Sequence, residues 1–298
     1  MKLGFIGVGN MGGPMCRNLI KKKFQVVVCD LDAAAVARCV ALGATTAKSA
    51  KEVAAQSDVV FASLPGPVEI EAVALGPGGI LEGAHPGMIY VDLSTNSPAM
   101  ARRIAAEFNK RGIPMLDAPV SGGVPGAEAG TVSVIVGGPR ATFDEVRPML
   151  EAIGKNLYHM GDIGAGCIAK LVNNMIAFVN FSALSEGMMM GVKAGVDPQK
   201  LLNVISTSSG NSNAVAKVQR KVFSGNYAPE FALDLAHKDL RLALQLGDET
   251  GVPLMFGGLL VNLMREARAK GYGGQDSSVM MRLLEDAMQT EVRVPKQA

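Results

Sequence analysis

The sequence predicts an α/β domain with a mostly parallel sheet, followed by an all-α domain joined to it through one long helix. Three observations predict this fold class. Short runs rich in β-branched residues alternate with helical patterns in the first part of the chain, which is typical of parallel sheets with crossover helices. After about residue 161 only helical patterns follow. A length of 298 residues suits two domains of about 150 residues each, so we predict domains at 1–161 and 162–298.

The predicted strands of the first domain are apolar almost throughout, as expected of strands covered on both faces. They are 3–6, 24–30, 58–64, 88–94, 114–120, 131–137 and 156–160. Signals for helix starts lie between them. Asp32 precedes one helical pattern, and Ser49, followed three residues later by a glutamate, forms a capping box. Ser97 and Pro98 begin another helix.

The second domain is predicted to be helical to its end. The helices are expected at 163–194, 198–207, 213–223, 231–250, 254–270 and 276–289. The first would be roughly 45 Å long, more than one domain needs, so we expect it to belong to both domains. Its exposed apolar surface suggests a homodimer or homotetramer. Because it contains Lys170, Asn174 and Glu186, a buried helix is a better interpretation than a membrane span.

Composition excludes several classes of function. The 29 basic and 27 acidic residues leave a net charge of +2, which argues against a nucleic-acid partner bound through its phosphates. The four cysteines form no CxxC pair, and the three histidines share no metal-ligand spacing, so no metal site is predicted. The sequence also shows no secretory signal. We expect a reducing compartment, the cytoplasm or an organelle matrix.

A glycine-rich motif directly follows the first predicted strand. The segment LGFIGVGNMG contains the pattern GxGxxG between a strand and a helix, which is the context of a dinucleotide-binding Rossmann turn. The first glycine permits the tight turn, the second lets the backbone approach the pyrophosphate, and the third permits close packing of helix on strand. The pyrophosphate would lie at the helix N-terminus. The predicted cofactor-binding residues here are Gly7, Gly9, Asn10, Met11 and Gly12.

Asp30 ends the second predicted strand, 23 residues after Gly7. An acidic residue about 20 residues after the first motif glycine binds the ribose 2′-OH in such domains, and it repels a 2′-phosphate. No lysine or arginine follows before Arg38, so we predict NAD as the cofactor over NADP. The alternative is that Asp30 only helps to cap the helix that begins near Asp32.

Four spaced segments resemble a known family. They are GFIGVGNMGGPMCRNL, DAPVSGGVPGAEAGTVSVIVGG, GAGCIAKLVNN and HKDLRLAL. Their order is similar to that in the β-hydroxyacid dehydrogenases, a group that includes 3-hydroxyisobutyrate dehydrogenase, tartronate semialdehyde reductase and 2-(hydroxymethyl)glutarate dehydrogenase. The resemblance covers essentially the whole chain. It implies a Rossmann domain followed by a helical domain.

The resemblance implies that Lys170 is the catalytic acid/base and that Asn174 orients the substrate. Helical periodicity is compatible with this, since Lys170 and Asn174 lie about 40° apart around the predicted long helix. An ammonium group there could donate a proton to a carbonyl oxygen during reduction. The alternative is a lysine that lies near a helix end and extends its charge into water.

The resemblance assigns the substrate carboxylate to Ser121, Gly122 and Gly123. Two glycines after a strand can present successive N–H groups to an anion, and the serine hydroxyl adds a donor. The alternative is an ordinary glycine turn. Phe231 could form one wall of the substrate pocket, although a core phenylalanine is the commoner case.

Four further residues are predicted to contact the cofactor. Leu64 and Pro65 follow the predicted strand 58–64, at the edge of the sheet where dinucleotides bind. Thr95 matches the family position at the nicotinamide end, and Lys238 matches a family lysine that extends toward the cofactor. The alternative for Lys238 is a solvated charge that pairs locally with Asp239.

These interpretations together predict an NAD-dependent dehydrogenase that interconverts a small β-hydroxy acid and its semialdehyde. One alternative is an NADP-dependent reductase of glyoxylate or succinic semialdehyde from the same family. Another is a dinucleotide-binding regulator without catalysis, which we would expect to lack Lys170. The specific hydroxy acid is not identified by the sequence, and the segment FALDLAHKDL is most similar to the 2-(hydroxymethyl)glutarate branch.

Overall fold

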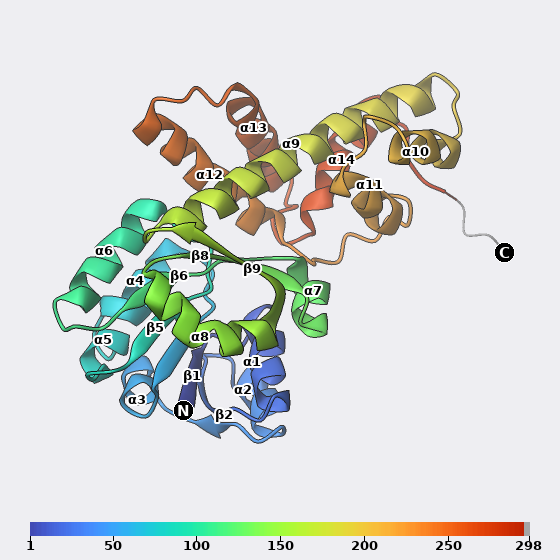
Figure 1. Ribbon diagram of the computed structural model, residues 1–298. Helices are drawn as coiled ribbons and strands as arrows, with labels where there is room; N and C mark the ends of the chain where they lie inside the picture. The colour runs from blue at the N-terminus through green and yellow to red at the C-terminus, as the bar shows by residue number, and fades with distance from the viewer. Residues whose placement is uncertain (295–298) are drawn as a thin grey trace. The chain divides into compact units, whose positions relative to one another are not determined.

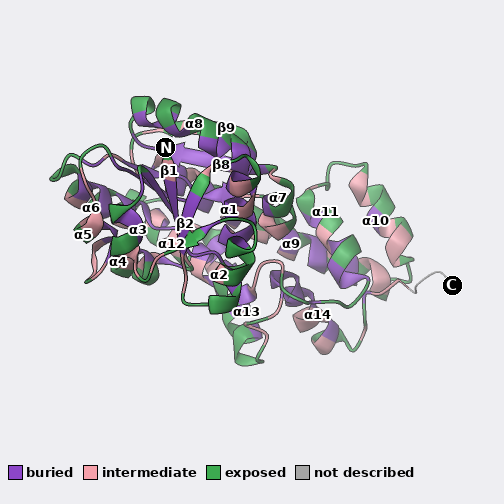
Figure 2. Ribbon diagram, turned by 90° about the horizontal axis from the view of Figure 1, so that it is seen from below, coloured by how far each residue is buried: buried purple, intermediate pink, exposed green. Residues whose placement is uncertain are grey.

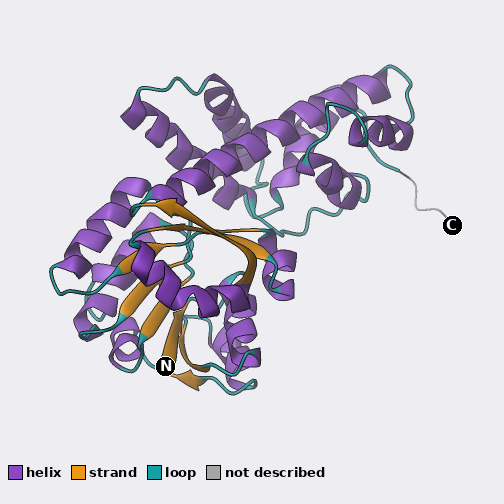
Figure 3. Ribbon diagram, in the orientation of Figure 1, coloured by secondary structure: helices purple, strands orange, loops and turns teal. Residues whose placement is uncertain are grey.

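A computed structural model describes residues 1–294 (Figures 1 and 3). The chain divides into two compact units, of which the first is Met1–Lys170 and the second begins at Leu171. The division falls inside a 29-residue helix, α9 (Ala165–Lys193), beyond the boundary at 161 that the sequence analysis places before this helix.

The first unit alternates strands and helices. Its strands are β1 (Lys2–Ile6), β2 (Gln25–Cys29), β3 (Thr45–Thr46), β4 (Val59–Ala62), β5 (Ile89–Asp92), β6 (Met115–Asp117), β7 (Val120–Ser121), β8 (Val132–Gly137) and β9 (Gly154–Gly161). Its helices are α1 (Gly12–Lys21), α2 (Ala33–Val40), α3 (Ala50–Ala55), α4 (Pro67–Leu75), α5 (Ile80–Gly83), α6 (Pro98–Asn109), α7 (Gly123–Ala129) and α8 (Arg140–Ile153).

The strands form one sheet in the order β3-β2-β1-β4-β5-β6-β8-β7, with β9 paired to β8. All pairs from β3 to β6 are parallel, whereas β8 is antiparallel to β6 and β7. The prediction of a mostly parallel sheet is therefore confirmed. Because β1, β2, β4, β5 and β6 run in one direction, the residues that follow them all emerge at one edge of the sheet.

Two apolar cores cover the two faces of this sheet. Side chains alternate along each strand, so that Leu3 and Phe5 of β1 join one core while Ile6 joins the other. The first core packs the sheet against α1, α2 and α8, and the second against α3, α4, α5 and α6. Figure 2 shows the central strands mostly in the buried colour, whereas β3 and most of β9 are not buried. Burial on both faces explains why the strands are almost entirely apolar.

The predicted helix starts are confirmed by side-chain caps. Asp32 accepts a hydrogen bond from the N–H of Ala34, and Ser97 accepts one from Met100. Ser49 accepts one from Glu52, but the Glu52 carboxylate binds the N–H of Lys48 and not that of Ser49, so the predicted capping box is only half formed. Each cap satisfies an N–H that has no partner within its helix.

The predicted strand 114–120 is wrong as a single element. It is split into β6 and β7, and the interruption falls at Ala118 and Pro119. Proline has no N–H to donate to a sheet ladder, so the chain leaves β6 there and pairs again with β8 in the antiparallel sense. This break separates the end of β6 from the Ser121–Gly122–Gly123 turn.

The second unit is helical, as predicted. Beyond its part of α9 it contains α10 (Pro198–Ser206), α11 (Asn213–Lys217), the π-helix η1 (Val218–Val222), α12 (Leu233–Thr250), α13 (Met255–Ala269), the 3-10 helix η2 (Ser277–Met280) and α14 (Met281–Met288). The predicted helix 213–223 thus changes type at Val218, and the predicted helix 276–289 begins as a 3-10 turn.

The second unit has one core of its own. Phe181, Leu184, Met188 and Met189 of α9 pack in it with residues of α12, α13 and α14. By length and composition alone α9 could cross a membrane. Only 33% of its most apolar stretch is buried, although the four residues above pack in this apolar core. Val172, Ile176 and Met190 on the same helix remain exposed.

Candidate active site

The turn between β1 and α1 has the geometry that the glycine motif predicts. Gly7 has a φ of +82°, a left-handed conformation that L side chains rarely adopt, and its N–H donates to the carbonyl of Cys29 at 3.0 Å. A Cβ at Gly12 would collide with the carbonyl oxygen of Gly7, whereas a Cβ at Gly9 would meet nothing within 4 Å. The backbone is therefore packed tightly at Gly12 and open at Gly9, which leaves room for a pyrophosphate beside the start of α1.

Asp30 connects the end of β2 to this turn. Its Oδ2 accepts a hydrogen bond from the N–H of Val8 at 2.6 Å, and its Oδ1 accepts one from Asp32 at 2.8 Å. Asp32 itself caps α2, so the cap is supplied without Asp30. A carboxylate has about four acceptor positions, so Asp30 can still accept from ribose hydroxyls. Arg38, the first basic residue after it, lies 4.0 Å from Asp32.

Hydrogen bonds join the ends of β4 and β5 at the edge of the sheet where the parallel strands end. The N–H of Leu64 donates to Ser94 Oγ at 2.9 Å, and the N–H of Ser94 donates to Asp92 Oδ1 at 3.0 Å. This network fixes the turns that carry Leu64 and Pro65 on one side and Thr95 on the other. The sequence analysis did not single out Ser94 as the residue that links them.

Asp92 and Asp117 form a buried acidic pair that the sequence analysis missed. They lie opposite each other at the ends of β5 and β6, and both are fully buried. Burial, together with the smaller effect of the Asp117 charge, raises the pKa of Asp92 to about 6 against hydrogen bonds from Ser94 that lower it. Burial also raises the pKa of Asp117, opposed by hydrogen bonds from backbone N–H groups.

We expect Asp92→Asn to stabilise the protein at neutral pH. Because the pKa of Asp92 in the folded protein lies above its usual value of 3.8, its contribution to stability is complete below about pH 4 and is lost as the pH rises through about 6. The full shift corresponds to roughly 3 kcal/mol of free energy of unfolding. Thermal unfolding of both proteins from about pH 4.5 to 8 measures this. A difference in Tm that does not grow with pH would contradict it.

The Ser121–Gly122–Gly123 turn follows β7. Ser121 is partly exposed and pairs with Ser133 of β8. Gly122 and Gly123 have φ values of +141° and +63°, so the backbone adopts the conformations for which glycine is favoured. The turn is therefore shaped by its two glycines.

Lys170 and Asn174 lie one turn apart on α9, and both side chains are buried, with 8% and 7% of their surface exposed. Asn173 is exposed, and its Nδ2 donates to Asn174 Oδ1 at 3.2 Å. Asn174 Nδ2 in turn donates to Asp239 Oδ2 at 2.7 Å. The amide of Asn174 is thus held from both ends, which leaves one of its N–H bonds for another acceptor.

Asp239 is the residue that the sequence analysis assigned only as a local partner of Lys238. It lies on α12 with 1% of its surface exposed, and its Oδ1 is 3.1 Å from Lys238 Nζ while its Oδ2 binds Asn174. One buried carboxylate therefore joins two of the predicted site residues of the second unit. The signal in the sequence was an acidic residue directly after the predicted cofactor lysine.

Phe231 precedes α12 and is only partly buried. Its ring stacks on Phe178 of α9, with centroids 6.1 Å apart, and its N–H donates to Asp276 Oδ2 at 3.1 Å. Asp276 is fully buried and also lies 3.1 Å from Lys217 Nζ. The segment that carries Phe231 is therefore anchored by a buried carboxylate that also pairs with Lys217.

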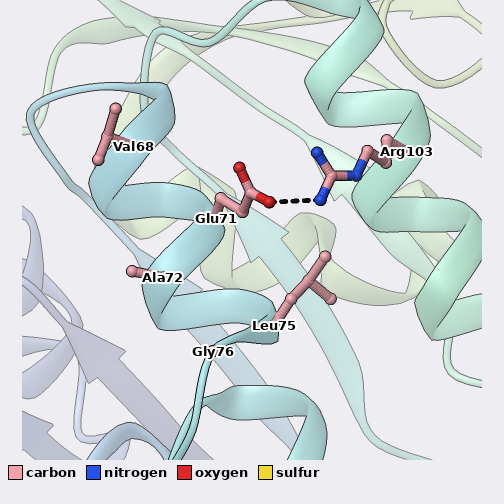
Figure 4. Close-up of a pocket in the computed structure, with 6 residues that line it drawn as sticks. All are labelled: Val68, Glu71, Ala72, Leu75, Gly76 and Arg103. Atoms are coloured by element: carbon pink, nitrogen blue, oxygen red, sulfur yellow. Dashed lines mark hydrogen bonds and ion pairs between the residues drawn. The ribbon is translucent and has the colours of Figure 1, made fainter.

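A surface pocket lies away from all of these residues, between α4 and α6 (Figure 4). It is lined by Val68, Glu71, Ala72, Leu75, Gly76 and Arg103. Its two charged groups pair with each other, Arg103 as donor and Glu71 as acceptor. Since none of the predicted site residues lines it, we assign it no part in the site.

Known proteins resemble both parts of the chain. Residues 2–161 match the family described as the NAD binding domain of 6-phosphogluconate dehydrogenase, and residues 164–284 match the family described as NAD-binding of NADP-dependent 3-hydroxyisobutyrate dehydrogenase. The 2-(hydroxymethyl)glutarate dehydrogenase of Eubacterium barkeri is 43% identical over 96% of this chain and 95% of its own length.

Two further relatives agree with these matches. The 3-hydroxyisobutyrate dehydrogenase of Pseudomonas aeruginosa is 40% identical over 88% of this chain and 90% of its own. A solved structure of the Mycobacterium tuberculosis 3-hydroxyisobutyrate dehydrogenase with L-serine superposes with a TM-score of 0.87 at 33% identity, covering 95% of this chain and 98% of that one. The resemblance found in the four sequence motifs is confirmed, and the chain belongs to the β-hydroxyacid dehydrogenase family.

Proposed function

We propose that this protein is an NAD-dependent oxidoreductase that interconverts a small β-hydroxy acid and its semialdehyde, with Lys170 as general acid/base. The observation that carries the proposal is the buried lysine one helical turn before an asparagine whose amide is held by Asp239. A lysine that merely extended its charge into water would be exposed. Membership of the family and the relatives at up to 43% identity support the reaction class.

In the proposed reaction Lys170 moves the proton. During oxidation its neutral amine takes the proton of the substrate hydroxyl while the carbon gives up its hydride, and a carbonyl is left. During reduction its ammonium returns a proton to the carbonyl oxygen. A nicotinamide cofactor held by the residues named below would supply the acceptor or the donor of that hydride. Asn174 donates its remaining N–H to the reacting oxygen and so orients it toward Lys170.

The substrate carboxylate is proposed to bind at Ser121, Gly122 and Gly123. The conformations of the two glycines and the partly exposed serine support a site that offers N–H and O–H donors to an anion. Phe231 would provide an apolar wall for the rest of a small substrate.

The cofactor is proposed to be held by residues that follow the parallel strands, together with Lys238 of α12. Gly7, Gly9 and Gly12, with Asn10 and Met11 between them, would accommodate the pyrophosphate, and Asp30 would bind the adenosine ribose. Leu64, Pro65, Thr95 and Lys238 would lie along the nicotinamide half. The open backbone at Gly9 supports a dinucleotide, and the carboxylate of Asp30 supports NAD as the preferred one.

A substrate panel tests the proposal. We expect absorbance of reduced nicotinamide to rise when the protein is given NAD and the correct member of a set that contains 2-(hydroxymethyl)glutarate, 3-hydroxyisobutyrate and L-serine. Semialdehydes and glyoxylate with the reduced cofactors test the opposite direction. Binding of NAD by calorimetry without turnover on any member would favour the non-catalytic regulator instead.

We further propose that the protein assembles as a homodimer or homotetramer. Exposed apolar side chains on helices of the second unit, among them Val172, Ile176, Met255 and Phe256, support an interface. Light scattering after size-exclusion chromatography gives the mass in solution, and a monomer at micromolar concentration would contradict the proposal.

A further inference from the structure

Asp117 binds the start of the helix that carries Lys170. It is the last residue of β6, and its side chain is fully buried. Its Oδ1 accepts a hydrogen bond from the N–H of Gly164, and its Oδ2 accepts one from the N–H of Cys167, both at 2.7 Å. Gly164 directly precedes α9, and Cys167 lies in its first turn. Both oxygens of the Asp117 carboxylate therefore accept hydrogen bonds from the N-terminus of one helix.

These N–H groups belong to the set that a helix leaves without internal partners. The first N–H groups of an α-helix have no carbonyl one turn before them, so they bind side chains or water. Residues close in sequence usually supply this cap. Here the cap comes from a strand about 50 residues earlier in the chain, since Asp117 and Cys167 are separated by 50 positions. The position of the first turn of α9 is therefore set by a residue of the sheet.

The close approach of helix and sheet leaves no space at this contact. A Cβ at Gly166 in the first turn of α9 would collide with the backbone of β8 and with the Asp117 carbonyl oxygen. A Cβ at Gly137, which lies opposite Asp117 in the sheet, would collide with the Asp117 carboxylate. The two glycines let the helix end lie directly on the strands, and a short, rigid connection results.

Lys170 lies three residues, or about 4.5 Å along the helix axis, beyond Cys167. Side chains on a helix lean toward its N-terminus, so the Cα–Cβ bond of Lys170 is tilted toward the turn that Asp117 holds. A shift of this turn therefore moves the Cα atom of Lys170 with it. A displacement of about 1 Å in an active site can lower a rate by about 100-fold.

We propose that Asp117 is a positioning residue. By capping α9 from the end of β6, it sets the position and orientation of Lys170. This inference rests on the proposed role of Lys170 as the acid/base. In this role Asp117 acts through Lys170 and does not itself transfer a proton to the substrate.

The variant Asp117→Asn tests this role with the smallest change of shape. Asparagine offers one acceptor oxygen for the two N–H donors, and it turns an NH₂ group toward the other. We expect kcat to fall by about 10- to 100-fold while the KM for NAD stays within about twofold of the wild-type value. The primary deuterium isotope effect, measured with substrate labelled at the oxidised carbon, should rise because the transfer step limits turnover. Asp117→Ala should lower kcat at least as much.

Ser49→Ala is the matched control. It removes a cap from α3, a helix of the same unit that carries no proposed site residue. We expect a loss of stability without a change in kcat or in the isotope effect. If Asp117→Asn behaved like this control, with kcat and the isotope effect of the wild type, Asp117 would be structural only and the proposal would be overturned.

Hydrogen exchange of the wild-type protein provides a measurement that needs neither turnover nor a folded variant. The amide of Cys167 should be strongly protected, because its hydrogen is bound to Asp117. Exchange at the rate of an unstructured peptide would overturn the inference.

The kinetic results separate this inference from the proposed function. Loss of activity in Lys170→Ala together with an unchanged kcat in Asp117→Asn would refute this inference but leave the proposed function intact. Absence of any turnover by the wild type would instead count against the proposed function. Protection of the Cys167 amide would still show whether Asp117 caps α9.

Discussion

Replacing Lys170 by alanine is expected to lower kcat for hydride transfer by about 10²- to 10⁴-fold, the usual contribution of a positioned general acid or base. The KM for NAD should change little, because the residues proposed to hold the cofactor lie elsewhere. Steady-state kinetics followed at the nicotinamide band gives both constants. Lys170→Met, which keeps the length of the side chain without its charge, should behave as the alanine variant does.

Lys170→Arg separates proton transfer from charge. A guanidinium keeps the positive charge but does not give up its proton in proteins, since its pKa lies far above neutral pH. If Lys170 acts as an acid/base, the arginine variant should be about as slow as the alanine variant. If the lysine only attracted an anionic substrate, arginine would restore much of the activity. Added primary amines should partly rescue Lys170→Ala and not Lys170→Arg.

Lys193→Ala is the control for these variants, because Lys193 lies in the last turn of the same helix and is exposed. Its kcat should equal that of the wild type. A Lys170→Ala protein that folds normally and turns over at nearly the wild-type rate would exclude the assignment.

Much of the fold could be predicted from the sequence because its signals are local. The apolar runs of β1, β2, β4 and β5 mark strands buried on both faces, and the caps at Asp32, Ser49 and Ser97 are short-range hydrogen bonds. The interruption between β6 and β7 was missed, although Pro119 was a visible signal for it. Helices α7 and α8 were also missed. Their positions depend on packing against the sheet as much as on their own sequence.

The residues of the candidate site also divide into those with a local signal in the sequence and those without one. Gly7 and Asp30 could be identified because the turn that uses them is formed within one strand–helix–strand segment. Asp117 and Asp239 could not, because their partners Cys167 and Asn174 lie 50 and 65 positions away. Contacts over such separations arise from the tertiary fold and leave no spacing pattern in a single sequence.

Removing the charge of Asp30 is expected to change the choice of cofactor. We expect the wild-type protein to use NAD with a kcat/KM more than about tenfold above that for NADP, because the carboxylate accepts hydrogen bonds from the ribose and repels a 2′-phosphate. Hydrogen bonds to a charged group contribute about 1.5–3 kcal/mol, so Asp30→Asn should lower kcat/KM for NAD by about 10- to 100-fold. It should raise kcat/KM for NADP, because the repulsion is gone.

The ratio of the two specificity constants is the quantity that decides this prediction. Asparagine keeps one oxygen for the N–H of Val8, so the glycine-rich turn should retain its shape. Any decrease in kcat/KM that arises from a changed shape of the turn would affect both cofactors equally. It would therefore cancel in the ratio. Asp32→Asn is the matched control, since its carboxylate caps α2 and lies two residues away. That variant should leave the ratio unchanged. A wild-type protein that prefers NADP, or an Asp30→Asn variant with an unaltered ratio, would show that Asp30 serves the turn and not the ribose.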